Sequence, residues 1–326
     1  MNKVFYSYFK DHIQSYVELK QAIGHKFDAT AGTLKRFDRF LLKKYPEATV
    51  LTKEIILEWC SKKTHEAQAN QYHRACTIRQ FGKHLDSLGH KAYIVPEGYY
   101  PVPKQYSPHI YTMDELDRFF KAIDTCQFCY RLPYQRQIMP VIFRMFYMCG
   151  LRLSEARFLK TTDVNLETGV LTINHSKHDN SRLVPMSDSL TERCRSFSQS
   201  IHSEVAKDYY FPGFNNKPLT IASIYSNFRK FLWHAGISHH GKMGGPRIHD
   251  FRHTYAVHCL KKWVEQGKNL TTCLPMLKTY MGHKSFQGTA YYLRMTADVF
   301  PDITMKIEAL YPEIIPKLQG EIDETY

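Results

Sequence analysis

The sequence has no long hydrophobic run. A membrane-spanning helix needs about 18 or more consecutive apolar residues, whereas the apolar stretch 141–143 is interrupted at Arg144. Residues 1–11 also lack the apolar stretch and small-residue cleavage site that are typical of a secretory signal peptide. We therefore expect a protein that acts in the cytoplasm and does not contact a membrane.

Cysteines are few, and acidic residues are outnumbered by basic ones. The 8 cysteines, expected as reduced thiols in a cytoplasm, include a CxxC pair, Cys126 and Cys129, with no second pair to complete a zinc cluster. The 44 Lys and Arg against 31 Asp and Glu give a net charge of +13. This excess favours a polyanionic partner, because neutralised phosphates release counterions. A solvated basic surface without a ligand is the alternative.

The length of 326 residues predicts two domains. Residues 1–95 place apolar side chains at spacings of three or four, which indicates a helical domain with basic faces. Residues 96–110 are rich in Pro and Tyr and form the linker. Thr112 is the expected N-cap of the first helix in a second domain, 111–300. Residues 301–326 form an acidic tail with helical apolar spacing, interrupted by prolines.

The second domain is expected to be mainly helical with a small β-hairpin. Residues 140–148 are apolar on nearly every side, which predicts a buried helix ended by Gly150. Two short β-type runs, 170–173 and 182–184, flank the polar turn 176–181 and predict the hairpin.

Four segments carry polar residues that a simple fold would not require. Taken singly, each residue has an ordinary structural explanation. Taken together, they suit attack on a phosphodiester: arginines clamp phosphate oxygens, a histidine moves a proton, a lysine protonates the leaving alkoxide and a tyrosine attacks. These residues are Arg152, Lys177, His249, Arg252, His283 and Tyr292.

The same segments resemble those of the tyrosine recombinases, the phage integrase family. Residues 249–253 match the family's His-x-x-Arg-His box, and Gly282-His283 is followed nine residues later by Tyr292. Residues 176–185 resemble the family's Gly-Lys-Gly-x-x-x-Arg-x-Val-Pro hairpin. The motifs cover about residues 110–300, and the N-terminal domain resembles the family by architecture only.

The resemblance implies a helical, SAM-like core-binding domain followed by an α+β catalytic domain. It implies a site-specific DNA recombinase or integrase that cleaves and rejoins strands through a 3′-phosphotyrosine, serving integration, excision or transposition of a mobile element. No metal and no other cofactor is implied. The implied partners are double-stranded DNA at specific sites and further copies of the chain, which form a tetramer on paired sites. The tail, 301–326, would dock on a neighbouring protomer, with folding back on its own domain as the alternative.

The resemblance also implies how the phosphate is held. Arg152 and Arg252 would bind the scissile phosphate, and His283 would donate a hydrogen bond to a non-bridging oxygen. Glu155 would orient Arg152.

The remaining roles concern bond making and proton transfer. Tyr292 would be the nucleophile, Lys177 the general acid and His249 the proton acceptor and donor. The neighbouring Tyr291 has the wrong spacing from His283. Because nine residues on one helix would place His283 and Tyr292 on opposite sides, we expect a break in the helix, for which Gly288 offers a place.

Two alternatives belong to other classes of protein. A zinc hydrolase is suggested by His249 and His253, which have the i, i+4 spacing of a zinc-binding helix; however, Asp250 stands where the protease pattern has Glu. A non-catalytic DNA-binding protein would explain the basic charge. It would leave the six-residue constellation unexplained.

Overall fold

The chain divides into two compact units, residues 1–105 and 106–326. No helix in the described part of the chain is long and apolar enough to cross a membrane. The computed structural model describes residues 4–25, 27–103, 106–126, 134–174, 181–202, 208–241, 244–283, 285 and 287–300.

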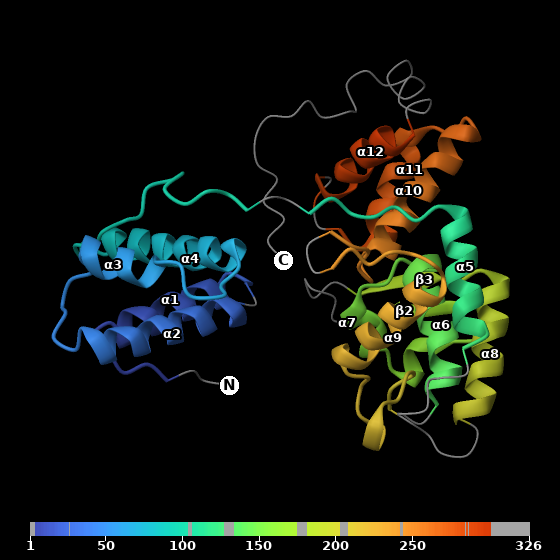
Figure 1. Cartoon of the computed structure of the whole chain (residues 1–326), viewed down its shortest axis with the longest axis horizontal. Helices are drawn as coiled ribbons and strands as arrows, with labels where there is room; N and C mark the ends of the chain where they lie inside the picture. The colour runs from blue at the N-terminus through green and yellow to red at the C-terminus, as the bar shows by residue number, and fades with distance from the viewer. Residues whose placement is uncertain are drawn as a thin grey trace. The chain divides into compact units, whose positions relative to one another are not determined.

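The N-terminal unit is helical, and α4 packs against α1, α2 and α3 (Figure 1). Its core is aromatic, with Phe37 and Phe81 fully buried and the Trp59 ring 5.3 Å from that of Phe37. The apolar spacing predicted such helices because their inward positions recur every three or four residues. The helices are α1 (Lys10–Ala22), α2 (Asp28–Lys44), α3 (Lys53–Cys60) and α4 (Gln68–Ser87).

The core of the second unit is built around α6, which contacts α5, α8 and α10. The predicted N-cap at Thr112 is confirmed, because its side chain accepts the Glu115 N–H and the Glu115 carboxylate accepts the Thr112 N–H. The predicted buried helix is confirmed as α6. The helices from this part of the chain are α5 (Met113–Asp124), α6 (Gln135–Met148), α7 (Leu153–Arg157), α8 (Asp188–His202), α9 (Ile221–His234) and α10 (Asp250–Glu265), with short 3₁₀ turns η1 (Thr161–Asp163) and η2 (Phe214–Asn216).

A small antiparallel sheet lies in the second unit, in the order β1 (Val164–Asn165), β2 (Val170–Ile173) and β3 (Arg182–Pro185). The predicted pairing of β2 with β3 is confirmed, with Ile173 opposite Arg182. The sequence did not indicate β1, because a strand of two residues leaves no alternation to detect. A mainly helical fold with a small sheet is therefore confirmed.

The last two described helices, α11 (Leu270–Met281) and α12 (Gln287–Val299), pack on α10. The expected break between His283 and Tyr292 is present, but its predicted place at Gly288 is wrong, because Gly288 lies inside α12. The break lies between the end of α11 at Met281 and the start of α12 at Gln287, and its first residue is Gly282. This residue caps α11 with φ 67°, a left-handed conformation that only glycine adopts without strain.

Candidate active site

Arg152 lies in the turn between α6 and α7. Gly150 has φ 57° there, and a Cβ at this position would lie 3.1 Å from Sδ of Met281. Arg152 caps α7: its N–H donates to Glu155 Oε2 at 2.9 Å, and its Nη1 donates to Glu155 Oε1 at 2.7 Å. Its Nη2 donates to the Gly282 carbonyl at 3.2 Å. Both terminal nitrogens of the Arg152 guanidinium are therefore held by hydrogen bonds.

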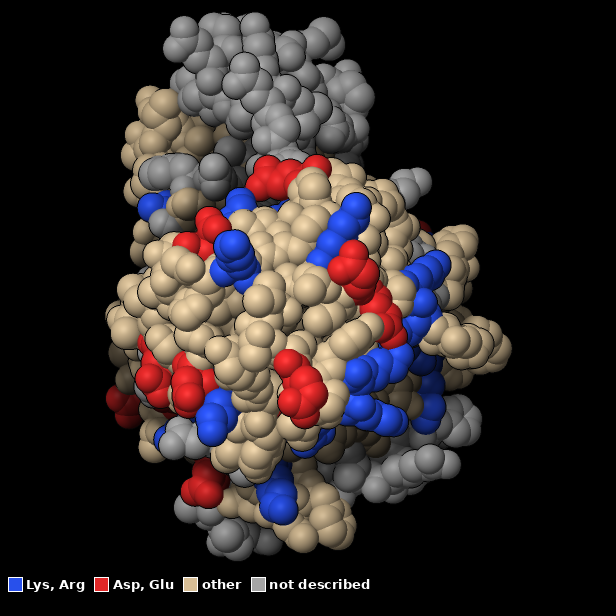
Figure 2. Space-filling view, turned by 90° about the vertical axis from the view of Figure 1, so that its left-hand side faces the viewer, with Lys and Arg blue, Asp and Glu red and all other residues tan. Residues whose placement is uncertain are grey.

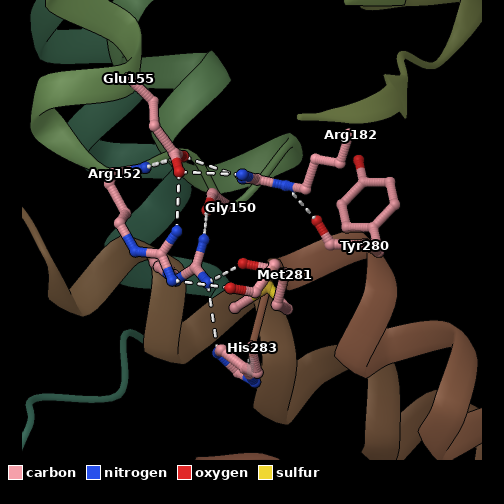
Figure 3. Close-up of polar contacts among 9 residues, drawn as sticks. Gly150, Arg152, Glu155, Arg182, Tyr280, Met281 and His283 are labelled. Atoms are coloured by element: carbon pink, nitrogen blue, oxygen red, sulfur yellow. Dashed lines mark hydrogen bonds and ion pairs between the residues drawn. The ribbon is translucent and has the colours of Figure 1, made fainter. Parts of the chain in front are cut away.

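Arg182 is a site residue to which the motifs gave no role. Its Nη1 and Nη2 donate to the two Glu155 oxygens, each at 2.9 Å, and its Nε donates to the Tyr280 carbonyl at 2.8 Å (Figure 3). The structure shows why Arg182 needs a partner. In β3 the arginine is buried whereas Leu183 is 66% exposed, the inverse of the burial expected for a charged and an apolar side chain.

Glu155 is the negative centre of this cluster. Burial alone would raise the pKa of its carboxyl, but the hydrogen bonds and charge of Arg182, with the charges of Arg252 and Arg152, lower it to about 2. The carboxylate is therefore ionised at neutral pH. Because one negative charge faces three arginines, the pocket keeps an excess of positive charge, which suits a phosphate.

Arg252 is almost fully buried on α10. It donates through Nη1 to the Gly150 carbonyl, and through Nη2 to the Met281 carbonyl and to His283 Nε2, the last at 3.2 Å. Burial and the nearby charge of Arg152 lower its pKa to about 10, so that it remains charged at neutral pH. Arg252 and Arg152 thus donate to the neighbouring carbonyls of Met281 and Gly282, which holds the two guanidiniums close to each other.

His283 follows Gly282 and joins Arg252 to α12. An arginine can only donate, so Nε2 of His283 is the acceptor in that bond and the ring proton is on Nδ1. Nδ1 then donates to Thr289 Oγ1 at 3.1 Å. Burial, and then the positive charge of Arg252 and Arg152, lowers the pKa of His283 to about 3, so the ring is neutral. The motifs gave Thr289 no role.

Tyr292 lies in α12 with 3% of its surface exposed. Its ring stacks on that of His283, with centroids 5.6 Å apart and planes at 18°, and lies 5.4 Å from the His253 ring. The neighbouring Tyr291 lies 5.9 Å from Tyr292 and 6.2 Å from His253. The break between α11 and α12 therefore brings Tyr292 next to the histidine predicted nine residues earlier.

His249 caps the N-terminus of α10, and its ring lies 4.7 Å from that of His253. Burial, and then the proximity of His253 and Arg252, lowers the pKa of His249 well below its usual value. The imidazole is therefore neutral at pH 7. Within the residues that the structure describes, no three His, Cys, Asp or Glu side chains form a group that could hold a metal ion. The pair suggested for a zinc hydrolase thus has no third ligand there.

The structure brings together six of the seven predicted site residues. The seventh, Lys177, belongs to the segment 175–180, which lies outside the described residues. Its flanking strands β2 and β3 are described. Its role therefore stays a prediction.

The comparison with known protein families covers the part of the chain that holds all the predicted site residues. The model of the phage integrase family matches residues 110–298, a range that includes every one of these site residues. The chain belongs to the phage integrase family. It is thus a tyrosine recombinase, an enzyme that cleaves and rejoins DNA.

One relative of this recombinase matches it over most of its length, and another matches about half of it. The integrase/recombinase y4rB of Sinorhizobium fredii is 28% identical over 309 residues, covering 93% of this chain and 98% of that protein. XerC of Chlamydia caviae is 28% identical over 158 residues, covering 48% of this chain and 46% of the relative.

Two solved structures share the fold of this recombinase. The XerH site-specific recombinase bound to a palindromic difH substrate has a TM-score of 0.61 and 19% identity, covering 84% of this chain and 78% of that one. The integrase of the transposon Tn1549 bound to circular intermediate DNA also has a TM-score of 0.61, with 16% identity and coverage of 86% and 94%.

Proposed function

We propose that this recombinase cuts DNA by attack of the Tyr292 hydroxyl on the scissile phosphate. The observation that carries the proposal is that residues from separate parts of the chain meet in one site. Arg152 comes from the turn before α7, Arg252 from α10, His283 from the turn after α11 and Tyr292 from α12. Arg252 nevertheless contacts His283, the His283 ring stacks on Tyr292, and Arg152 donates to the carbonyl of Gly282, next to His283. A fold needs no such gathering of cations around a tyrosine, whereas a tyrosine that must lose its proton does.

The reaction is a transesterification in which the number of phosphodiester bonds is unchanged. The Tyr292 oxygen bonds to phosphorus, the bond to the 5′-oxygen breaks, and a 3′-phosphotyrosine forms. His249 takes the tyrosine proton, and Lys177 gives a proton to the departing 5′-oxygen. Attack by another 5′-hydroxyl reverses these steps and rejoins the strand. The phosphotyrosine bond conserves the energy, so the steps need no ATP and no cofactor.

The two arginines hold the phosphate while negative charge grows on its oxygens. Arg152 and Arg252 donate to non-bridging oxygens, and Glu155 keeps Arg152 oriented through two bonds. A phosphate oxygen that takes the Arg252 donor also releases His283 Nε2. His283 can then donate to the phosphate from Nε2 if Thr289 donates to Nδ1, which its hydroxyl can do because it serves as donor or acceptor.

The N-terminal unit is proposed to grip the duplex as a core-binding domain. A cleft of about 370 Å³ between α2 and the start of α4 is lined by the basic side chains of Arg36, Lys63 and Arg74. Arg74 is paired with Glu66 at 2.6 Å, which makes the exposed Arg36 and Lys63 the candidates for backbone phosphates. On the face drawn in Figure 2, basic side chains gather toward the right-hand edge.

The assembly and the biological setting follow from the same proposal. We expect recombination sites to be paired by a tetramer, with the tail 301–326 docking on a neighbouring protomer; this tail lies outside the described residues. The Tn1549 integrase acts for a transposon, which supports a mobile element as the setting. A DNA substrate favours the cytoplasm as the place of action.

The test is formation of a covalent protein–DNA adduct on a nicked substrate, resolved by denaturing gel. Tyr292→Phe should bind DNA with unchanged affinity and form no adduct, because only the attacking oxygen is lost. Tyr291→Phe is the matched control and should form adduct. If Tyr292→Phe still forms adduct, or if only Tyr291→Phe loses it, our assignment of Tyr292 as the nucleophile is wrong. Loss of wild-type adduct in EDTA would favour metal chemistry instead.

A further inference from the structure

The chain enters the second unit at Tyr106, and this tyrosine is bound to the turn that leads into α10. Its hydroxyl lies 2.6 Å from Asp250 Oδ2 and 3.0 Å from the Gly245 carbonyl oxygen. A hydroxyl has one proton to donate, and the carboxylate is the stronger acceptor. The guanidinium carbon of Arg247 lies 3.4 Å from the centre of the Tyr106 ring and covers it.

Asp250 closes the turn from which two proposed catalytic residues project. It is fully buried, and its Oδ2 also accepts the Arg247 N–H at 2.8 Å, while its own N–H donates to the Arg247 carbonyl at 3.0 Å. His249 directly precedes Asp250, and Arg252 follows two residues later. The direction of His249 at the start of α10 is thus set by the turn that the Asp250 carboxylate holds.

The Tyr106 hydroxyl helps this carboxylate to stay in the protein interior. Burial raises the pKa of Asp250, whereas the hydrogen bonds from Tyr106 and from the Arg247 N–H lower it. Without the Tyr106 hydroxyl, the buried Asp250 carboxylate has one hydrogen-bond donor fewer. Burying a charged oxygen with too few donors costs enough free energy to shift the turn that leads into α10.

The residues after Tyr106 are held to the same helix. The Tyr111 N–H donates to Thr254 Oγ1 at 3.1 Å, and the Tyr111 ring stacks on Phe251 with centroids 4.6 Å apart and planes at 4°. The segment 106–111 therefore follows the first turns of α10 through several independent contacts. The contact of Tyr106 with Asp250 is thus one of several contacts that hold the segment 106–111 against the start of α10.

We propose that Tyr106 is a positioning residue for DNA cleavage, which acts through Asp250 on the turn that orients His249. The proposal rests on the role proposed above for His249. Tyr106 touches neither the phosphate nor the nucleophile in this scheme. Its contribution is to the rate of the chemical step and not to the affinity for DNA.

The test compares Tyr106→Phe with Tyr210→Phe in the full chain, in single-turnover cleavage of a nicked substrate. Tyr210 also donates from a buried hydroxyl in the same unit, to the Cys194 carbonyl at 3.1 Å, but far along the chain from the α10 turn. We expect Tyr106→Phe to cleave about tenfold more slowly, because a tenfold change in rate corresponds to the loss of about one hydrogen bond to a charged group. Its affinity for DNA should stay within about twofold of the wild-type value. Tyr210→Phe should cleave at the wild-type rate.

Double variants show whether the effect passes through the proposed residues. In an Asp250→Asn background and in a His249→Ala background, Tyr106→Phe should slow cleavage by less than about twofold, because the residues act as one unit. Wild-type cleavage by Tyr106→Phe, an equal loss in Tyr210→Phe, a loss of DNA affinity instead of rate, or full additivity with His249→Ala would each overturn the proposal. Absence of adduct from the wild-type protein would instead contradict the proposed function.

Discussion

Replacing Glu155 by glutamine tests whether one buried carboxylate holds the arginine cluster together. Glutamine has nearly the same shape and still accepts hydrogen bonds, but it carries no charge. In Glu155→Gln, the guanidiniums of Arg152 and Arg182 would face a neutral amide in a site where the Glu155 side chain is only 2% exposed. Breaking a buried ion pair by removing one partner typically costs about 3–5 kcal/mol.

The pKa of Glu155 gives a second measure of the same effect. The folded value of about 2 lies below the ordinary value of 4.5. Each pKa unit is worth about 1.4 kcal/mol, so ionised Glu155 stabilises the fold by about 3 kcal/mol. Because the folded pKa is the lower one, this stabilisation is complete above pH 4.5 and is lost as the pH falls toward about 2. At pH 3.5, roughly 1 kcal/mol of it should be gone.

The assay is urea unfolding of both proteins at pH 7 and pH 3.5, followed in the transition of the second unit. The free energies of unfolding should differ by about 3 kcal/mol at pH 7 and by about 2 kcal/mol at pH 3.5. His253 and His283, with pKa values lowered to about 3 chiefly by burial, destabilise both proteins below about pH 6.5 and cancel in the difference.

A surface ion pair provides the control. Asp124 accepts two hydrogen bonds from Arg144, at 2.9 and 2.7 Å, but its side chain is 38% exposed. Asp124→Asn should therefore cost less than about 1 kcal/mol. Equal losses in Asp124→Asn and Glu155→Gln, or a gap between wild type and Glu155→Gln that does not change with pH, would refute the reasoning.

Three further predictions follow from other parts of the structure. Gly282→Ala places a Cβ 3.0 Å from Arg182 Nη1 at a positive φ, so it should lower the melting temperature and slow cleavage, whereas Gly98→Ala, with φ 79° and open space, should spare cleavage. Arg252→Lys should keep DNA affinity and slow adduct formation by about 100-fold or more, since a lysine cannot reproduce the fork of donors; an unchanged rate would contradict the clamp. DNA affinity should fall steeply with salt concentration, and Lys63→Gln should reduce the slope by about one in titrations by fluorescence anisotropy; an unchanged slope would remove Lys63 from the phosphate contacts.

Local signals in the sequence predicted the local structure well. The capping box that starts at Thr112, the buried α6 and the β2–β3 hairpin all depend on neighbouring residues, so their patterns are visible along the chain. The six site residues that the structure brings together were predicted because their spacing matches a known set of motifs. The roles of these residues stay predictions until the variants are measured.

What the sequence could not predict depends on contacts between distant segments. Arg182 and Glu155 are 27 positions apart, and nothing local shows that both guanidinium nitrogens meet one carboxylate. Thr289 became relevant only when the turn after α11 placed it beside His283. The break was assigned to Gly288 because it is the glycine between His283 and Tyr292, whereas the residue that adopts a positive φ is Gly282.

The enclosure of Tyr292 bears on how safely such an enzyme can travel along a chromosome. A chain with a net charge of +13 will associate with DNA at many places where no recombination is wanted. With 3% of its surface exposed, the Tyr292 side chain is largely enclosed by the protein and little accessible to a duplex bound at the surface. With Tyr292 as the proposed nucleophile, strand breakage would require the phosphate to reach this enclosed side chain, so that binding would be frequent and damage rare.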